Sequence, residues 1–249
     1  MKVLLSLCLL GLSLLPAAML NAAPDPSSKG TIPPVQAVKG HLWKCMRMGS
    51  FEMTGEFRTD KKSYPITLHT DGNEMLYTFT SEPLQIRVVI SPTQSTIQKR
   101  ASTSDAWTDV TGRARLQTIL GTDVTYEDLG LEFLRWEPVE PVGTDTLIGI
   151  KTWAFECTPA NASQFSKVRY WLTQAQCAFM RLDGYNSKGE VIKREEVTAI
   201  TNIRAMTVFK EIVISSIIPG RNISASRTRI TIRNTKVIRE LAPDKPDKR

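Results

Sequence analysis

Histidine is scarce in this sequence: among 249 residues there are two, His41 and His69. His41 and Cys45 have the i, i+4 spacing of one helical face, but two potential ligands do not complete a zinc site. The chain also lacks the G-x-S-x-G, H-E-x-x-H, P-loop and dinucleotide-binding glycine patterns. No nucleophile with a neighbouring base can be recognised. These absences argue against an enzyme and predict a protein without a metal ion or cofactor.

Cysteine is also rare, with four residues. Cys8 lies in an N-terminal apolar run, so Cys45, Cys157 and Cys177 remain once that run is removed. An odd number leaves at least one thiol without a disulfide partner. Cys157 and Cys177 are predicted near opposite ends of neighbouring strands, which argues against a bridge between them. We therefore expect buried thiols that pack as small apolar side chains.

Long apolar runs are absent apart from one near the N-terminus. Lys2 precedes an almost continuous apolar run over residues 3–15, Pro16 ends it, and small residues follow up to Ala23. This order is typical of a secretory signal peptide, which we predict over residues 1–23. The run is short for a membrane span, so a retained anchor is the less favoured alternative. We expect the rest of the chain to be exported and soluble.

Acidic residues are the minority among charged residues, with 25 Asp and Glu against 32 Lys and Arg and a formal net charge of +7. The excess is concentrated after Arg221, and residues 227–233 contain three arginines. Nucleic acid is not expected as a partner of an exported protein. The basic region could attract anionic membranes or acidic partners. The favoured interpretation is a solvated edge strand followed by a polar tail.

The chain after the signal peptide divides into three parts. Residues 24–34 are rich in Pro, Ser and Gly and predict a flexible leader. Residues 35–240 have the size of a single domain, and residues 241–249 form a polar tail. At the start of the domain, apolar residues with roughly helical spacing predict a short amphipathic helix over residues 35–48.

Most of the domain alternates between apolar and polar residues, which is the pattern of half-buried strands. Phe51, Met53 and Phe57 show this alternation, and Asp71-Gly72 is a pair that favours hairpin turns. Further strands are predicted at residues 64–68, 75–79, 84–90, around 97, 107–110, 153–157, 168–172, 177–183, 191–197, 206–218 and 222–233. Consecutive strands with short turns predict an antiparallel meander.

One segment between the strands has a helical pattern over residues 125–134. Thr125 and Asp128 have the spacing of a capping box. The apolar residues that would share one face of this helix are Tyr126, Leu129 and Phe133. The adjacent carboxylates Glu127 and Asp128 are explained by capping and by the helix dipole, without catalysis.

The apolar face of such a sheet must be covered by another part of the protein. A second sheet would make a sandwich, and helices would make a half-shell. An incompletely filled interior would instead leave a pocket of lipid size. Periodicity alone does not distinguish these arrangements.

The run LGTDVTYEDL at residues 120–129 resembles the GSDFSYEDL signature of the bacterial outer-membrane lipoprotein-sorting (LolA-like) proteins. Residues 149–159, 167–172 and 180–193 resemble later strands of that family in the same order. Val124 stands where the signature has Phe, and the aromatic C-terminal ending common in the family is missing. The resemblance implies a mainly β (α+β) fold, a half-open antiparallel β-barrel with short helices packed in its concave side.

The resemblance also implies a periplasmic location and an apolar cavity that receives lipid or lipoprotein acyl chains. An acyl chain needs such shielding, because each buried methylene is worth roughly 0.8 kcal/mol. A mobile lid could close the cavity, and Arg58 is the candidate for the arginine that latches such a lid in the family. The candidate lining residues are Phe51, Met53, Phe57, Tyr77, Phe79, Ile86 and Val88, and each has core packing as its alternative role.

The sequence therefore predicts a monomeric, non-enzymatic periplasmic carrier of the outer-membrane lipoprotein-sorting type. Inner- or outer-membrane proteins are further candidate partners. The alternative is a periplasmic interaction or lipid-sensing module of the same fold. In that case the sheet is solidly packed, and an exposed edge or the basic strand at residues 227–233 docks a protein partner.

Overall fold

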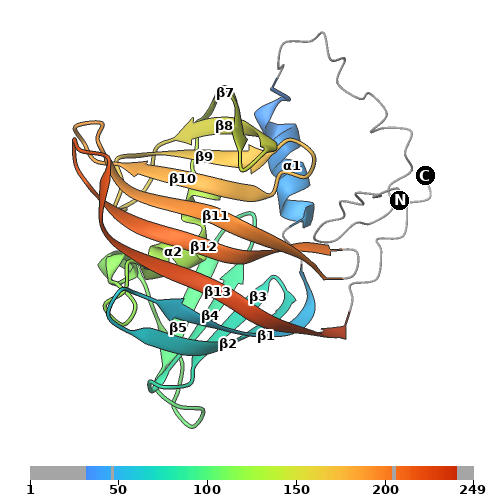
Figure 1. Cartoon of the computed structure of the whole chain (residues 1–249), viewed down its shortest axis with the longest axis vertical. Coiled ribbons are helices and arrows are strands. Elements are labelled where there is room, and N and C mark those ends of the chain that lie inside the picture. Colours follow the sequence, from blue (N-terminus) through green and yellow to red (C-terminus); the bar gives the residue numbers. More distant parts are fainter. Residues whose placement is uncertain (1–31, 46–47, 204–205, 240–249) are drawn as a thin grey trace.

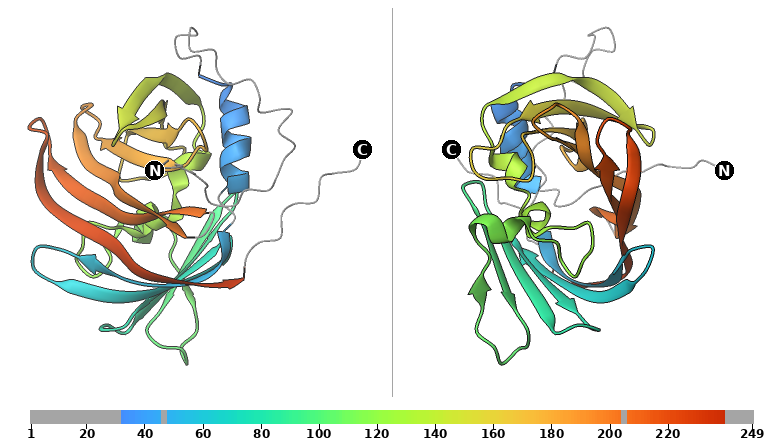
Figure 2. Two further views of the ribbon diagram at one scale, coloured as in Figure 1. Left: turned by 45° about the vertical axis from the view of Figure 1, so that its right-hand side comes forward. Right: turned by 90° about the vertical axis from the view of Figure 1, so that its left-hand side faces the viewer.

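The structure is a computed structural model that describes residues 32–45, 48–203 and 206–239. Within these residues thirteen strands form one sheet in the order β6-β5-β4-β3-β2-β1-β13-β12-β11-β10-β9-β8-β7. The sheet curls without closing, because β6 and β7 form its two edges (Figures 1 and 2). The predicted half-open antiparallel barrel is confirmed. The predicted signal peptide and polar tail lie outside the described residues, as does most of the predicted leader.

The strands form two antiparallel meanders, each continuous in sequence. The first contains β1 (Met48–Arg58), β2 (Ser63–Gly72), β3 (Glu74–Phe79), β4 (Leu84–Ile90), β5 (Ser95–Arg100) and β6 (Thr108–Asp109). The second contains β7 (Val139–Leu147), β8 (Ile150–Cys157), β9 (Lys167–Thr173), β10 (Phe179–Tyr185), β11 (Val191–Ile203), β12 (Met206–Ile218) and β13 (Ile223–Arg239). The sequence pattern misses β7, because Pro141 and Gly143 interrupt its alternation and most of its side chains are exposed.

The two meanders are joined by β1 and β13, which come from opposite ends of the domain and place Phe57 opposite Ile230. Near the middle of this pair the strands approach closely. A Cβ atom at Gly55 would lie 2.1 Å from the carbonyl oxygen of Thr231, so this position requires glycine. The predicted edge strand at residues 227–233 is wrong, because β13 pairs with β1 on one side and β12 on the other.

Two large apolar clusters fill the inner side of the curled sheet. The first combines β1–β5 with inward residues of β12 and β13, such as Ile214 and Ile230. The second combines α1 with β8, β9 and β10 and includes Phe155 and Leu182. Strict alternation produces this arrangement: in β13 Ile230 and Ile232 are buried, while Arg229 between its buried neighbours is partly exposed, as the sequence predicts.

The short helices lie on the inner side of the sheet or beside its opening. Helix α1 (Val35–Cys45) confirms the predicted helix and packs near β7 (Figure 1). A short 3₁₀ helix, η1 (Gly112–Leu116), follows β6. In the ranges that the structure describes, every helix falls short of the length and apolar character that a bilayer crossing would need.

The predicted helix over residues 125–134 is broken into two pieces. Helix α2 (Tyr126–Gly130) ends where Leu131 takes a left-handed conformation with φ 46°, and the 3₁₀ helix η2 (Glu132–Arg135) follows. The break changes the direction of the chain. Leu129 packs in the first cluster, whereas Phe133 packs in the second, so the single apolar face predicted for this helix is wrong.

The predicted burial of Cys157 and Cys177 is confirmed. Cys157 is a free thiol whose Sγ lies 3.5 Å from the Phe133 carbonyl oxygen, to which it donates. Burial raises the pKa of the Cys157 thiol to about 12. The thiol therefore stays protonated and unreactive at neutral pH. The side chain of Cys45 is outside the described part of the structure.

Candidate functional site

The predicted lining residues lie together on the concave side of β1, β3 and β4. Their exposed fractions run from 0 to 8%, and they share the first apolar cluster: Phe51, Met53, Phe57, Tyr77, Phe79, Ile86 and Val88. The rings of Phe57 and Phe79 meet edge to face, with centroids 5.3 Å apart. Burial also raises the pKa of the Tyr77 hydroxyl. These residues form one continuous apolar surface inside the curl of the sheet.

Residues 119–134, which we call the plug segment, cover this apolar surface. The plug segment lies within the curl of the sheet in the right panel of Figure 2. Four of its side chains belong to the same cluster as the predicted lining residues: Ile119, Val124, Tyr126 and Leu129. The plug segment therefore contributes to shielding the predicted lining residues from water.

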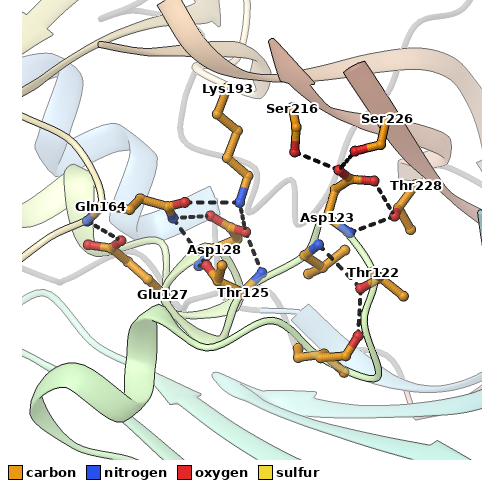
Figure 3. A network of polar contacts seen from close by, with 12 residues as sticks. Thr122, Asp123, Thr125, Glu127, Asp128, Gln164, Lys193, Ser216, Ser226 and Thr228 are labelled. Carbon is orange, nitrogen blue, oxygen red and sulfur yellow. Dashed lines mark hydrogen bonds and ion pairs between the residues drawn. The ribbon is translucent and has the colours of Figure 1, made fainter. Parts of the chain in front are cut away.

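Asp123 anchors the plug segment to the sheet. Its carboxylate accepts hydrogen bonds from Ser216 (2.6 Å), Thr228 (2.9 Å) and Ser226, and its own N–H donates to Thr228 Oγ1 at 2.8 Å (Figure 3). The three hydroxyl groups come from β12 and β13. Bonds to an ionised acceptor are stronger than those between neutral groups, so this anchor ties the plug segment to the middle of the sheet.

Asp128 provides a second anchor of the plug segment. Its carboxylate forms an ion pair with Lys193 of β11, and both side chains are almost fully buried, at 3% and 6% exposed. The same carboxylate accepts the N–H of Thr125 at 2.6 Å and the side-chain amide of Gln164 at 2.8 Å (Figure 3). Thr125 Oγ1 accepts the N–H of Asp128 in return, which confirms the predicted capping box.

Two further carboxyl groups surround this ion pair. Burial, reinforced by the neighbouring Asp128, raises the pKa of Glu195 on β11 well above its usual range, although Lys193 opposes the shift. Burial also raises the pKa of Glu127, which accepts the N–H of Gln164 at 3.1 Å. Burial and the neighbouring carboxylate of Asp128 both disfavour the charged form of Glu195 beside this ion pair.

Sequence reasoning missed Lys193 and Glu195 and assigned Asp128 only to capping. A signal was present. Residues 193–196 read Lys-Arg-Glu-Glu within a strand, so alternation must turn one basic and one acidic side chain inward. Lys193 and Glu195 are that inward pair, while Arg194 faces outward and bonds Asp183 at 2.8 Å.

The basic residues of β13 are largely neutralised on the outer face. Arg229 lies 2.6 Å from Glu211, and Arg233 lies 2.8 Å from Glu56. The candidate latch Arg58 is exposed at the end of β1, so it is not part of a buried latch. Over the described ranges, no group of three or more His, Cys, Asp and Glu side chains could hold a metal ion.

The fold is similar to solved structures with low sequence identity. An outer membrane lipoprotein-sorting protein domain from Vibrio parahaemolyticus is 13% identical with a TM-score of 0.67, over 84% of this chain and 95% of that chain. A DUF1329 family protein from Desulfovibrio piger is 16% identical with a TM-score of 0.63, over 84% and 95%. A LolA superfamily protein from Nitrosomonas europaea is 16% identical with a TM-score of 0.57, over 84% and 94%.

These likenesses confirm, at the level of the fold, the resemblance to LolA-like proteins. No curated protein matches the chain. A family model described as "uncharacterized protein" matches residues 102–245, which is more than half of the sequence and includes the plug segment and the second meander. The chain thus has the LolA-like fold and belongs to the family that this model defines.

Proposed function

We propose that this protein is a periplasmic, non-enzymatic carrier that binds acyl chains of lipids or lipoproteins. A signal peptide at residues 1–23 directs its export, and the single domain at residues 35–240 binds the acyl chains. The observation that carries the proposal is the continuous apolar surface of β1, β3 and β4, covered by a short segment instead of by a second sheet. The likeness in fold to a lipoprotein-sorting domain supports this function.

Binding requires the plug segment to move away from the lining residues. The seven proposed lining residues are at most 8% exposed, so an acyl chain reaches them only when the plug side chains leave. An acyl chain then covers the apolar area of the lining that the departing side chains expose, which offsets part of the cost of opening. The carboxylates of Asp123 and Asp128 then set the cost of opening, since they hold the plug segment to β11, β12 and β13.

Native mass spectrometry tests the proposal directly. The full chain is exported with its own N-terminal segment and purified from the periplasm without detergent. We expect a polypeptide that begins after residue 22 or 23 and carries an added mass of a lipid or an acylated peptide, lost on organic extraction. A protein that stays without added mass after incubation with phospholipid vesicles would contradict the carrier function.

Photo-cross-linking tests where the chain binds. Methionine is replaced by its diazirine analogue, which is close to it in size and shape. We expect light-induced lipid adducts at Met53, which is 6% exposed in the proposed lining. The matched control is Met180, which is 3% exposed but packs in a separate cluster. Equal labelling of the two residues, or labelling of Met180 alone, would rule out the proposed lining.

Weakening the Asp123 anchor should speed uptake. Asp123→Ala removes the acceptor of three hydroxyl hydrogen bonds, and bonds to a charged group are worth about 1.5–3 kcal/mol. We expect the uptake rate of a fluorescent fatty-acyl probe to rise by about tenfold or more. Asp105→Ala, in an exposed turn, is the control and should leave the rate unchanged. A rate for Asp123→Ala equal to that of the wild type would mean that this anchor does not limit opening.

A further inference from the structure

Polar side chains form a row across the concave side of the second meander. Lys193 of β11 pairs in register with Ser216 of β12, which pairs in turn with Ser226 of β13. Thr228 lies two residues further along β13, so its side chain is on the same face as Ser226. We call these four residues the polar strip. It begins at buried Lys193, passes half-buried Ser216 and reaches exposed Ser226, so one end opens to solvent.

The polar strip lies between the two apolar clusters. On one side, β10 contributes Leu182 to the second cluster, and on the other, β12 contributes Ile214 to the first. Lys193 is therefore a cation at the boundary of two apolar regions. Such a charge is costly to bury unless an anion compensates it.

The plug segment supplies that anion in the closed structure. Asp128 pairs with Lys193, while Asp123 accepts the hydroxyl groups of the other three residues (Figure 3). The side chains of the polar strip thus donate to carboxylate oxygens of the plug segment, and Thr228 Oγ1 also accepts the N–H of Asp123. The two carboxylates are five positions apart in one short segment, so both leave when that segment moves.

We propose that the polar strip binds the anionic head of the amphiphile whose acyl chain replaces the plug segment. This inference rests on the proposed function. A neutral amphiphile would leave Lys193 as an unpaired buried cation and three hydroxyl groups without their acceptor. A phosphate or carboxylate group replaces both carboxylates of the plug segment and restores the charge balance.

The charged and titratable groups described around Lys193 do not compensate its charge once the plug segment moves, so the ligand must supply the anion. Asp128 and Glu127 belong to the plug segment and are displaced with it. Glu195, two residues along β11, stays in place, but burial raises its pKa and so disfavours the charged form that would neutralise Lys193. The open end at Ser226 gives room for a headgroup that extends into water.

The test is competition between ligands that share their chains and differ in charge. The full-length exported protein is incubated with vesicles that contain equal amounts of dioleoylphosphatidylglycerol and dioleoylglycerol, and bound lipid is measured by native mass spectrometry. A second arm compares oleate with monooleoylglycerol and so separates phosphate from carboxylate. We expect the anionic member to be bound at least tenfold more than the neutral one in one arm or both.

Lys193→Met should bring this ratio close to one. Lys151→Met, which removes an exposed lysine of β8, makes the same change in net charge and should keep the wild-type ratio. Because Lys193→Met leaves Asp128 buried without its cation, the double variant Lys193→Met, Asp128→Asn keeps the closed state neutral. The double variant should also give a ratio close to one.

The outcomes separate the two proposals. If no lipid is bound in any arm, the carrier function itself fails, and the inference fails with it. If lipid is bound in proportion to the vesicle composition, the carrier function stands and the inference is overturned. A large anionic preference that survives in Lys193→Met and in the double variant also overturns it, because recognition then comes from elsewhere on this basic protein.

Discussion

Asp128→Ala is expected to lower the free energy of unfolding by about 3–5 kcal/mol, because it leaves a buried charge without its partner. Lys193 is 6% exposed and pairs with Asp128 across 65 residues of sequence. The substitution also removes the acceptor for the N–H of Thr125 and for the amide of Gln164. Urea denaturation followed by circular dichroism measures the change, with the slope checked for two-state behaviour.

An exposed ion pair of this protein provides the matched control. Asp60 and Arg227 lie 3.9 Å apart, with side chains 75% and 58% exposed, and pairs of this kind are worth roughly 0–1 kcal/mol. Asp60→Ala should therefore change stability little. The double variant Asp128→Asn, Lys193→Met should recover most of the loss, since it removes both charges together. A loss below about 1 kcal/mol in Asp128→Ala would mean that the ion pair does not hold the plug segment.

Glu195→Gln is expected to stabilise the protein at neutral pH and to flatten its dependence on pH. Burial raises the folded-state pKa of Glu195 well above the unfolded value, so the folded protein binds the proton more tightly. Its contribution to stability is fully present below the unfolded pKa and is lost as pH rises through the folded pKa. The wild-type stability should fall by up to about 1.4 kcal/mol per pH unit over that window.

The measurement is urea denaturation of both proteins between pH 4 and 9. The glutamine variant should show a smaller decline above about pH 4.5 and a higher free energy of unfolding at pH 7. A weaker slope of the same sign remains, because burial also raises the pKa of Glu127. Glu140→Gln, on the exposed edge strand β7, serves as the control and should reproduce the wild-type curve. If the free energies of unfolding of wild type and Glu195→Gln change with pH in parallel, another group causes the pH dependence.

The strands and their inward faces follow from local sequence rules. In β13 the alternation at residues 228–233 predicts which side chains are buried, and the structure agrees. The Asp71-Gly72 turn and the Thr125–Asp128 capping box also form as predicted, since both depend on neighbours within four residues. These rules fail at β7, where a proline and a glycine interrupt the alternation and an edge position removes the need for an apolar face.

The length of the predicted helix over residues 125–134 depended on more than local pattern. Tyr126, Leu129 and Phe133 have helical spacing, but the chain breaks at Leu131 so that Leu129 and Phe133 enter different clusters. Packing against two separate surfaces stabilises the break more than continuing the helix would. Propensity is a weak guide where tertiary contacts supply most of the burial.

The sequence by itself determined most of the strands, the alternating faces of those strands and the capped turn that begins α2, because these depend on residues close together in the chain. Only the tertiary structure decided that Lys193 faces the plug segment and that β13 lies in the middle of the sheet. Alternation says which residues of a strand share a face, but not what that face meets. Contacts between distant segments decide what that face meets. Lys193 meets Asp128 because a buried charge without a partner costs too much free energy.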